Sequence, residues 1–211
     1  MLGESSHCEI RPGVPADARA LSEIFRASWS GAYRGIIPHF HLDGMIERRT
    51  PDWWSTTIKS GGLLVLQVAG VVAGYATLGA ARTQGPYEGE IYELYLLPTH
   101  QGIGLGERLF EACRYHLDGR QFRGLIVWAL ADNEMAGEFY RRRGGRPVGT
   151  TSERFGRAKL KKIAFAWDCP DSPWQPVRRR SRGPDGGLAF LIAPGVAISR
   201  RNSFDRLEVP E

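Results

Sequence analysis

The feature of the sequence that most constrains the fold is a strand, a glycine-rich turn and a helix that follow one another from Glu90 to Asp118. Residues 91–97 are mostly apolar or aromatic and contain no glycine or proline, and Pro98 ends them. This pattern is typical of a buried strand. Along residues 105–117 the apolar side chains recur at spacings of three and four, which predicts an amphipathic helix.

The turn between them contains Gly102, Gly104 and Gly106 directly before the helix. Such a turn leaves backbone N–H groups uncovered where the helix dipole is positive, so it suits a phosphate or a diphosphate. Two phosphate-binding signatures do not fit. Gly106 is followed by Glu107 instead of the lysine of a P-loop, and Glu107 also occupies the third glycine position of the dinucleotide fingerprint. On the turn alone, a purely structural role stays open.

Length and composition predict one cytoplasmic domain with room for an appendage. The chain has 211 residues, 42% of them hydrophobic, and no apolar run approaches the roughly 18 residues that span a bilayer. The first ten residues lack the apolar core of a signal peptide, and three widely spaced cysteines indicate reduced thiols. The net charge of +5 favours an anionic ligand, although it also fits nucleic acid.

Periodicity predicts the other elements of the chain. Helical spacing runs from Pro15 to about Tyr33, and further helices are expected at about 42–49, at 52–58 and after Asn133. The expected strands are a short one at 8–11, a hairpin of 63–68 with 71–78, a third antiparallel strand at 90–97, a buried strand at 125–130, and a closing hairpin of 147–155 with 160–167. Strand, helix and strand in succession imply one parallel pair.

Three segments together identify a family. Gln101, Gly104 and Gly106 fit the pattern Q/R-x-x-G-x-G/A, and residues 28–38 read S-W-S-G-A-Y-R-G-I-I-P. Residues 133–144 fit N-x-x-A-x-x-F-Y-x-x-x-G, but Gly145 replaces the aromatic residue that usually follows. From about residue 6 to residue 167 the chain resembles the GNAT superfamily of N-acetyltransferases, in a bacterial branch with the S-W-x-x-A-Y-R-G-x-x-P first helix.

The resemblance implies an α/β (α+β) GNAT fold. Its mixed, mostly antiparallel sheet has about six to seven strands flanked by helices, with one splayed parallel pair. The expected domain covers 6–168. Residues 169–211 form a Pro- and Arg-rich extension outside the resemblance, where a short hairpin at 188–200 is one option and a solvated tail is another.

The resemblance also implies acetyl-CoA as co-substrate, bound by the glycine turn and the strand before it. Main-chain N–H groups near Leu94 to Leu96 would meet the oxyanion, and Tyr140 would protonate the departing CoA sulfur. Asn133 would contact the pantetheine arm or simply cap its helix, and Arg143 would reach the 3′-phosphate or be solvated. The full set of implied cofactor contacts is Leu94, Tyr95, Leu96, Gln101, Gly102, Ile103, Gly104, Leu105, Gly106, Asn133, Tyr140 and Arg143.

Two carboxylates compete for the role of catalytic base. Glu90 and Glu93 are three residues apart on one strand, so we expect them on opposite faces of the sheet. Glu90 falls where some family members place a catalytic glutamate, and we prefer it, acting through a water. Glu93 lies in an apolar run that would raise its basicity. A structural role for either stays open.

The acceptor side is expected at Trp29, Tyr33 and Arg34, although Trp29 also suits a core position. The motif from His39 to His41 has no third ligand nearby, so no metal is expected. Nearby aromatic residues favour the primary amine of a small molecule, with a peptide or protein amine as the alternative.

The predicted function is therefore N-acetylation by direct attack in a ternary complex. The competing interpretations are a CoA-binding regulatory module without turnover and a nucleic-acid-associated protein that uses its arginine tail. No membrane or nucleic-acid partner is expected. The acceptor's identity and a homodimer stay open.

Overall fold

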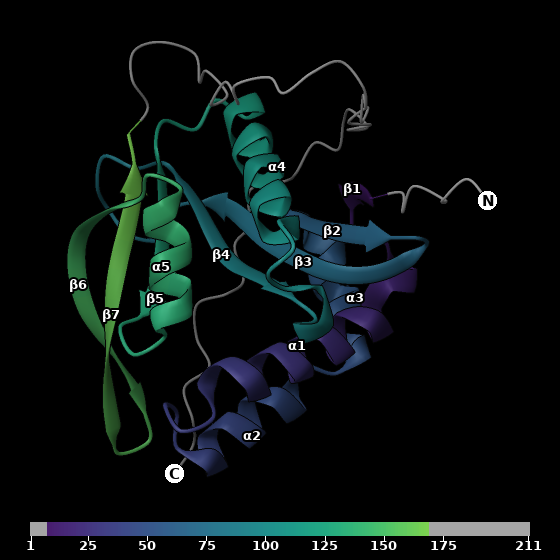
Figure 1. The fold of residues 1–211 in the computed structure, drawn as a ribbon, viewed down its shortest axis with the longest axis horizontal. Coiled ribbons are helices and arrows are strands. Elements are labelled where there is room, and N and C mark those ends of the chain that lie inside the picture. The colour runs from purple at the N-terminus through teal and green to yellow at the C-terminus, as the bar shows by residue number, and fades with distance from the viewer. Residues whose placement is uncertain (1–7, 169–211) are drawn as a thin grey trace.

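A mixed sheet with strand order β1-β2-β3-β4-β5-β7-β6 forms the centre of the protein (Figure 1). The structure is a computed structural model that describes residues 8–168. The strands are β1 (Cys8–Pro12), β2 (Leu63–Val68), β3 (Val71–Ala80), β4 (Gly89–Leu96), β5 (Leu125–Leu130), β6 (Arg146–Phe155) and β7 (Ala158–Trp167). The expected extension at 169–211, with its hairpin at 188–200, lies outside the described residues.

Within residues 8–168, five α-helices and two short 3₁₀ helices connect the strands. They are η1 (Pro15–Asp17), α1 (Ala18–Tyr33), α2 (His39–Arg48), α3 (Pro51–Ser60), η2 (Pro98–His100), α4 (Leu105–Gly119) and α5 (Glu134–Arg142). These elements confirm the predicted ones within a few residues. The helix predicted from Pro15 begins with the 3₁₀ turn η1, whose Pro15 suits a first helical position.

The sheet combines an antiparallel meander with one parallel pair, as predicted. The β2–β3 connection is a two-residue turn with positive φ at both Ala69 and Gly70, the geometry that matches the twist of the strands it joins. β4 pairs antiparallel with β3 and parallel with β5. The closing hairpin returns so that β7, not β6, pairs with β5.

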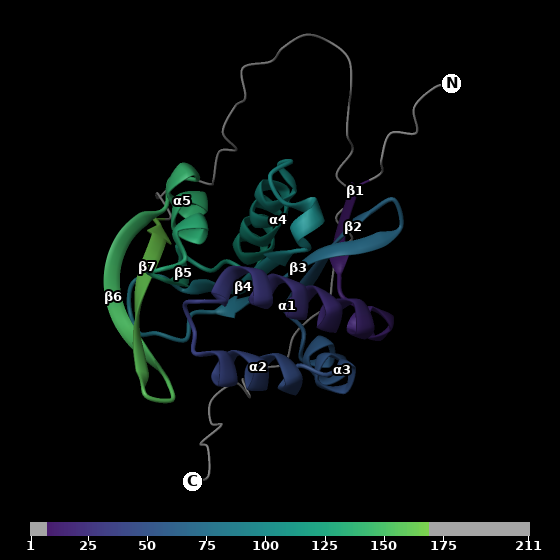
Figure 2. The same ribbon diagram turned by 60° about the horizontal axis from the view of Figure 1, so that its bottom comes forward.

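Helices cover both faces of the sheet, with α4 and α5 on one side and α1, α2 and α3 on the other (Figure 2). Each face has its own apolar cluster. Phe110, Cys113 and Tyr140 belong to the cluster under α4 and α5. Phe25 and Trp54 belong to the cluster under α1 to α3, which also takes in Leu130 and Phe155 from the far strands. Burial of these side chains is the main favourable term in folding.

Within residues 8–168, no helix is long and apolar enough to cross a membrane.

Candidate active site

The strands β4 and β5 separate at the centre of the sheet. Their parallel pairing covers only three residues on each strand, and its last pair is Ile91 with Val127. Beyond that pair, β4 continues to Leu96 beside β3, and β5 continues to Leu130 beside β7. Among residues 8–168, one edge of β4 therefore has no strand partner along its second half.

Two main-chain N–H groups of β4 point toward that open edge. The amide of Leu97 donates to the carbonyl of Ala73 on β3 (2.8 Å). Because successive residues of a strand direct their N–H groups to alternate sides, the amides of Tyr95 and Leu97 face β3 and those of Leu94 and Leu96 face away. Leu94 and Leu96 thus offer unpaired donors where β5 has diverged.

The carbonyl of Leu96, on the same edge, is already bonded. It accepts from the hydroxyl of Ser28 on α1 (2.9 Å) and from the side-chain amide of Gln101 (3.1 Å). Gln101, which the sequence assigned to the cofactor, therefore ties the glycine turn to the end of β4.

The glycine turn opens directly onto the first turn of α4. Gly102 and Gly104 both have positive φ, and a Cβ at either position would meet no other atom within 4 Å. Gly104 is the N-cap of α4 and supplies no side-chain hydrogen bond to the helix. No side chain at the N-cap position therefore covers the first N–H groups of α4. The N-terminal end of a helix favours anions. Ile103, between the two glycines, is exposed.

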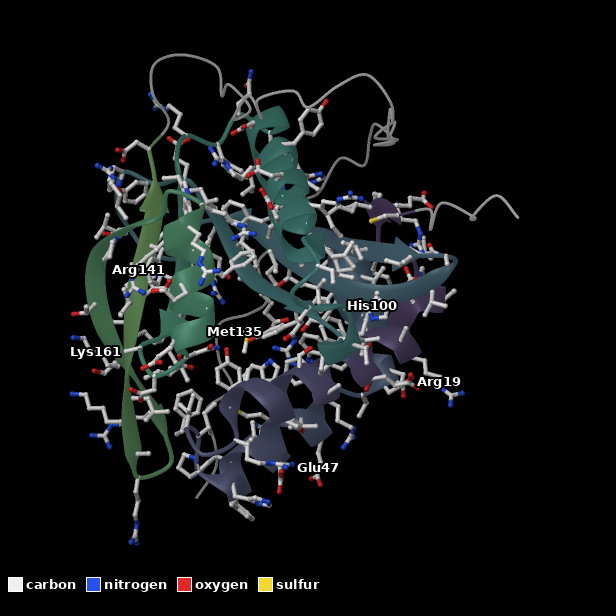
Figure 3. The ribbon with its side chains drawn as sticks, viewed as in Figure 1. Arg19, Glu47, His100, Met135, Arg141 and Lys161 are labelled. Atoms are coloured by element: carbon white, nitrogen blue, oxygen red, sulfur yellow. The ribbon has the colours of Figure 1, made fainter. Side chains whose placement is uncertain are left out.

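Gly106 allows α5 to approach the start of α4. A Cβ at Gly106 would lie 3.1 Å from the ring of Phe139 on α5 and 3.5 Å from Leu96. Figure 3 shows Met135 projecting from the first turn of α5 on the side where β4 and α1 lie, and its side chain is 67% exposed. The glycine turn, the open edge of β4 and the start of α5 therefore surround one region.

The two candidate carboxylates lie on the same face of the sheet, contrary to the expectation from their spacing. Glu93 pairs with Thr77 and Glu90 pairs with Gly79, two residues apart on β3. The register shift between these pairs makes Tyr92 an extra residue of β4. This β-bulge interrupts the alternation of side chains along β4, so two residues that are three apart face the same side. Both carboxylates consequently face the side of α1 to α3.

Glu90 is enclosed by donors from Arg82. Its side chain is 1% exposed, and its oxygens accept from Nη2 of Arg82 (2.7 Å), from Nε (3.2 Å) and from the Arg82 amide (2.8 Å). The guanidinium of Arg82 also lies over the ring of Tyr92. These contacts hold the connection after β3 against β4 and leave Glu90 little room to accept a proton from a substrate.

Glu93 has two partners, one on each oxygen. Its Oε1 accepts from Nη2 of Arg49 (2.7 Å), and its Oε2 accepts from the hydroxyl of Tyr75 (3.1 Å). Burial, together with the charge of Glu93, holds the pKa of Tyr75 well above its usual value, so this hydroxyl stays protonated as the donor.

Arg49 is itself held by aromatic rings. Its guanidinium carbon lies 3.8 Å from the ring centroid of Trp53, 4.8 Å from that of Phe25 and 5.5 Å from that of Trp54. Its carbonyl accepts from the hydroxyl of Ser22 on α1 (2.7 Å). Stacking of this kind fixes a guanidinium plane and is strongest where water is excluded.

Tyr33 connects the acceptor side with α5. Its hydroxyl bonds to that of Tyr95 (2.9 Å), and the Asn133 side chain partly offsets the effect of burial on its pKa. Asn133 caps α5, because its side-chain oxygen accepts from the amide of Ala136 (3.1 Å). Burial raises the pKa of Tyr33 and holds that of Tyr95 well above its usual value, so both hydroxyls stay protonated at neutral pH.

Tyr140 lies on the opposite side of the sheet, in the cluster under α4 and α5. Its ring packs against those of Phe139 and Phe165 at 5.2 and 5.7 Å. Burial raises the pKa of Tyr140, so its hydroxyl stays protonated.

The remaining predicted contacts divide between core and surface. Trp29 is buried against Phe25 and Tyr33, with ring centroids at 4.6 and 4.9 Å, so it belongs to the core under α1. Arg34 follows α1 and is exposed.

Arg143 stacks on the ring of Phe139 at 3.7 Å and donates to that residue's carbonyl (3.0 Å). Its side chain is 17% exposed and lies 3.8 Å from Glu107 on α4. These contacts join α4 to α5, and the expectation that Arg143 reaches CoA finds no support in them.

Sequence reasoning did not identify Arg49, Tyr75 and Arg82 as residues that hold the two carboxylates. A sequence signal was present only for Arg49, which lies four residues before two adjacent tryptophans. Within residues 8–168, no three His, Cys, Asp or Glu side chains gather in a way that could hold a metal ion.

The sequence matches the acetyltransferase (GNAT) family over residues 19–145. The uncharacterized N-acetyltransferase YuaI of Bacillus subtilis is 26% identical over 159 residues, which cover 75% of this chain and 91% of that protein. The mycothiol acetyltransferase of Paenarthrobacter aurescens is 31% identical over 125 residues, 56% of this chain but 38% of that longer protein.

Solved structures share the fold. The PaiA N-acetyltransferase from Thermoplasma acidophilum, determined in complex with coenzyme A, superposes with a TM-score of 0.59 at 18% identity. The match covers 76% of this chain and 99% of that one.

Proposed function

Since the chain belongs to the acetyltransferase (GNAT) family and is an N-acetyltransferase, we propose that it moves the acetyl group of acetyl-CoA to the primary amine of a small molecule. The amine attacks the thioester directly while both substrates are bound. One observation carries this proposal: the N-terminus of α4, which has no side-chain cap, lies next to the open edge of β4. The helix start offers amides for a diphosphate, and the edge of β4 offers amides for a thioester.

The diphosphate of acetyl-CoA would be held by the turn from Gln101 to Gly106. Positive φ at Gly102 and Gly104 turns the main chain without a side chain in the way, so that its N–H groups and the start of α4 remain open to an anion. The coenzyme A bound by the Thermoplasma acidophilum neighbour supports this assignment. The pantetheine arm would extend along β4, past the amides of Leu94 and Leu96.

The same two amides suit the charge that develops on the thioester oxygen. When the amine nitrogen bonds to the carbonyl carbon, negative charge moves to the oxygen. Fixed main-chain donors stabilise that charge without reorganisation, and the loss of one such donor typically costs about 10²–10³ in rate. Leu94 and Leu96 are therefore proposed as the oxyanion donors.

Glu93 is the better supported base. An amine with a pKa of about 10.4 must lose a proton before attack, which costs roughly 4–5 kcal/mol at neutral pH. Glu93 faces the same side as Tyr33 and Tyr95, and its side chain is 13% exposed. Glu90 is 1% exposed and is held by three donors of Arg82. Arg49 and Tyr75 would position the carboxylate of Glu93, which takes the proton through a water.

Tyr140 is proposed as the acid that protonates the CoA sulfur when the C–S bond breaks. Its hydroxyl is protonated at neutral pH and would give its proton to the thiolate that forms beside it. Tyr33 would contact the acceptor, and Asn133 would hold the Tyr33 hydroxyl while it caps α5.

A thiol-release assay with acetyl-CoA and a panel of primary amines tests this function. We expect at least one small amine to release CoA thiol at a rate well above the rate of hydrolysis without an acceptor. Release with peptide amines alone would move the acceptor to a protein. The absence of release with every acceptor, although CoA binds, would leave a binding module without turnover.

A further inference from the structure

One lysine of the closing hairpin faces inward. Lys161 and Lys159 are exposed, and Figure 3 shows Lys161 pointing outward from the hairpin. Lys162 takes the opposite face of β7, where it pairs with Leu130 of β5. Leu130 belongs to the apolar cluster under α1 to α3, so Lys162 lies on the acceptor side of the sheet.

Lys162 has one acidic neighbour and one aromatic neighbour there. Its Nζ lies 2.8 Å from Oε2 of Glu153 and 5.8 Å from the ring centroid of Trp128. The Lys162 side chain is 24% exposed and that of Glu153 is 45% exposed. The indole Nε1 of Trp128 is buried and has no hydrogen-bond acceptor within the described part of the chain. A buried donor of this kind is costly to leave unpaired.

This group lies near the proposed acceptor site. Phe155 and Leu160 of the hairpin share an apolar cluster with Tyr33. The amide of Asn133, at the start of α5, donates to the carbonyl of Leu130 (3.1 Å), the β5 residue that pairs with Lys162. Two ion pairs therefore lie on the same face of the sheet as Tyr33, Glu93 with Arg49 and Glu153 with Lys162.

We propose that the acceptor is an amine that also carries a carboxylate, as an amino acid does, and that Lys162 and the Nε1–H of Trp128 bind that carboxylate. This inference rests on the proposed function and names the substrate class of the same site. The carboxylate would replace Glu153 at Lys162 and would give the indole N–H its missing acceptor. The amino group would then point toward Tyr33 and Glu93.

The charge balance of the site favours this class over other amines. The two acids that act on Tyr33 are each paired with one base, so the ion pairs around the hydroxyl are neutral as a group. A polyamine could pair with Glu153 but would leave the Nε1–H of Trp128 without an acceptor. A zwitterion brings one charge of each sign, which matches such a site.

The first test compares acceptors that differ only in the carboxylate. Thiol release is measured with L-amino acids and with their carboxamides. We expect kcat/KM to be at least tenfold higher for the acids. Lys162→Met should remove most of this preference by raising KM for the acids, with little change for the amides. Trp128→Phe should reduce the preference in the same direction.

Lys161→Met is the matched control, because it removes the same charge from the outer face of the same strand. It should leave the ratio of acid to amide unchanged. Equal rates for acids and amides, or an unchanged ratio in Lys162→Met, would overturn the inference while the acetyltransferase activity stands.

A binding measurement keeps this inference separate from catalysis. N-acetyl amino acids, as products, should raise the thermal midpoint of the wild-type protein in the presence of CoA, and N-acetyl amino amides should not. Lys162→Met should lose that shift and Lys161→Met should keep it. If no acceptor releases thiol but this pattern holds, the proposed function fails and the carboxylate site remains. The absence of any shift in the wild type would count against the site.

Discussion

The carboxylates of Glu90 and Glu93 differ in what holds them, although they share one strand and one face. Arg82 surrounds Glu90 with a main-chain donor and two side-chain donors. Glu93 has one bond to Arg49 and one to Tyr75, and both oxygens face the aromatic acceptor side. A base needs to reach a proton on the substrate before its basicity matters. The arrangement therefore favours Glu93.

Glu93→Gln should lower kcat/KM by about 10²–10⁴, because a positioned base typically contributes that much. It should also remove the dependence of the rate on deprotonation of that carboxylate, which a pH–rate profile measures. Glu90→Gln is the matched control and should keep the wild-type profile, although it loses stability with its Arg82 contacts. If Glu90→Gln alone lost this pH dependence of the rate, Glu90 would be the base.

Tyr140→Phe should lower kcat with little change in the affinity for acetyl-CoA. Its ring packing against Phe139 and Phe165 survives the change, so the fold should remain. Without its proton donor, the thiolate must leave charged. Steady-state kinetics and a calorimetric titration separate the two quantities. Full activity in this variant would remove Tyr140 from the mechanism.

At the residue scale the sequence predicted the site only in part. It identified both glutamates but placed them on opposite faces, because strand alternation was counted without the bulge at Tyr92. It could not identify Arg49 or Tyr75 as partners of Glu93, since these contacts join positions 44 and 18 residues away in the chain. Main-chain donors such as Leu94 leave no mark on residue identity at all.

The turn between β4 and α4 is the element that combines fold and function. Gly104 has positive φ in open space, so its lack of a side chain serves the backbone conformation and not the packing. Elsewhere, the β2–β3 turn places Gly70 in the same situation. Gly104 and Gly70 therefore form a matched pair, of which only Gly104 belongs to the proposed site.

Gly104→Ala should lose about 1–2 kcal/mol of unfolding free energy, the cost of a left-handed backbone for an L-residue with a side chain. It should also weaken CoA binding at least tenfold, because the Cβ changes the turn that faces the diphosphate. Gly70→Ala should show the same stability cost with unchanged CoA affinity. Equal CoA affinity in both variants would contradict the role of the turn. Urea unfolding and calorimetric titration measure the two effects.

The junction of β1 with α1 depends on a buried acid. Asp17 accepts from Nη1 and Nη2 of Arg11 (2.7 and 2.9 Å) and from the amide of Val14 (2.8 Å). Burial alone would raise the pKa of Asp17, but these hydrogen bonds outweigh it and leave the pKa below its usual value. A lowered carboxyl pKa adds stability above the unfolded value of about 3.9, and this stability is lost as the pH falls through the folded value.

Asp17→Asn should therefore cost about 1–3 kcal/mol of unfolding free energy at pH 7. The deficit should shrink as the pH falls below about 4, where the wild type loses the same contribution. Urea unfolding at pH 7 and pH 3 measures it. Asp43→Asn, at a half-buried position of α2 where the carboxylate pairs with the exposed His39 (2.8 Å), should change little at either pH. A deficit that is independent of pH would show that lost packing, not charge, is responsible.

At the scale of elements the sequence was informative because periodicity reports local structure. The three-and-four spacing of apolar residues located α1 and α4, and alternation located the β2–β3 hairpin. The order of the last two strands, with β7 beside β5, depends on which strand buries more apolar surface. In β7 the last four residues are buried, whereas β6 is exposed along nearly its whole length.

At the scale of the whole molecule, the two faces of the sheet meet where β4 and β5 separate. On one face, α4 and α5 frame the region proposed for acetyl-CoA, and on the other, α1 to α3 and the closing hairpin frame the region proposed for the acceptor. The parallel pairing of β4 with β5 ends after three residues, so groups from the two faces can meet there. The account depends on a diphosphate bound at the glycine turn, which directs the thioester to this break.

Calorimetric titration of the purified protein with CoA, 3′-dephospho-CoA and pantetheine tests that claim most directly. The account predicts that CoA and 3′-dephospho-CoA bind with similar affinity, since the diphosphate provides the main contact. Pantetheine, which lacks the diphosphate, should bind at least tenfold more weakly. Equal binding of all three ligands, or no heat with CoA, would contradict the account.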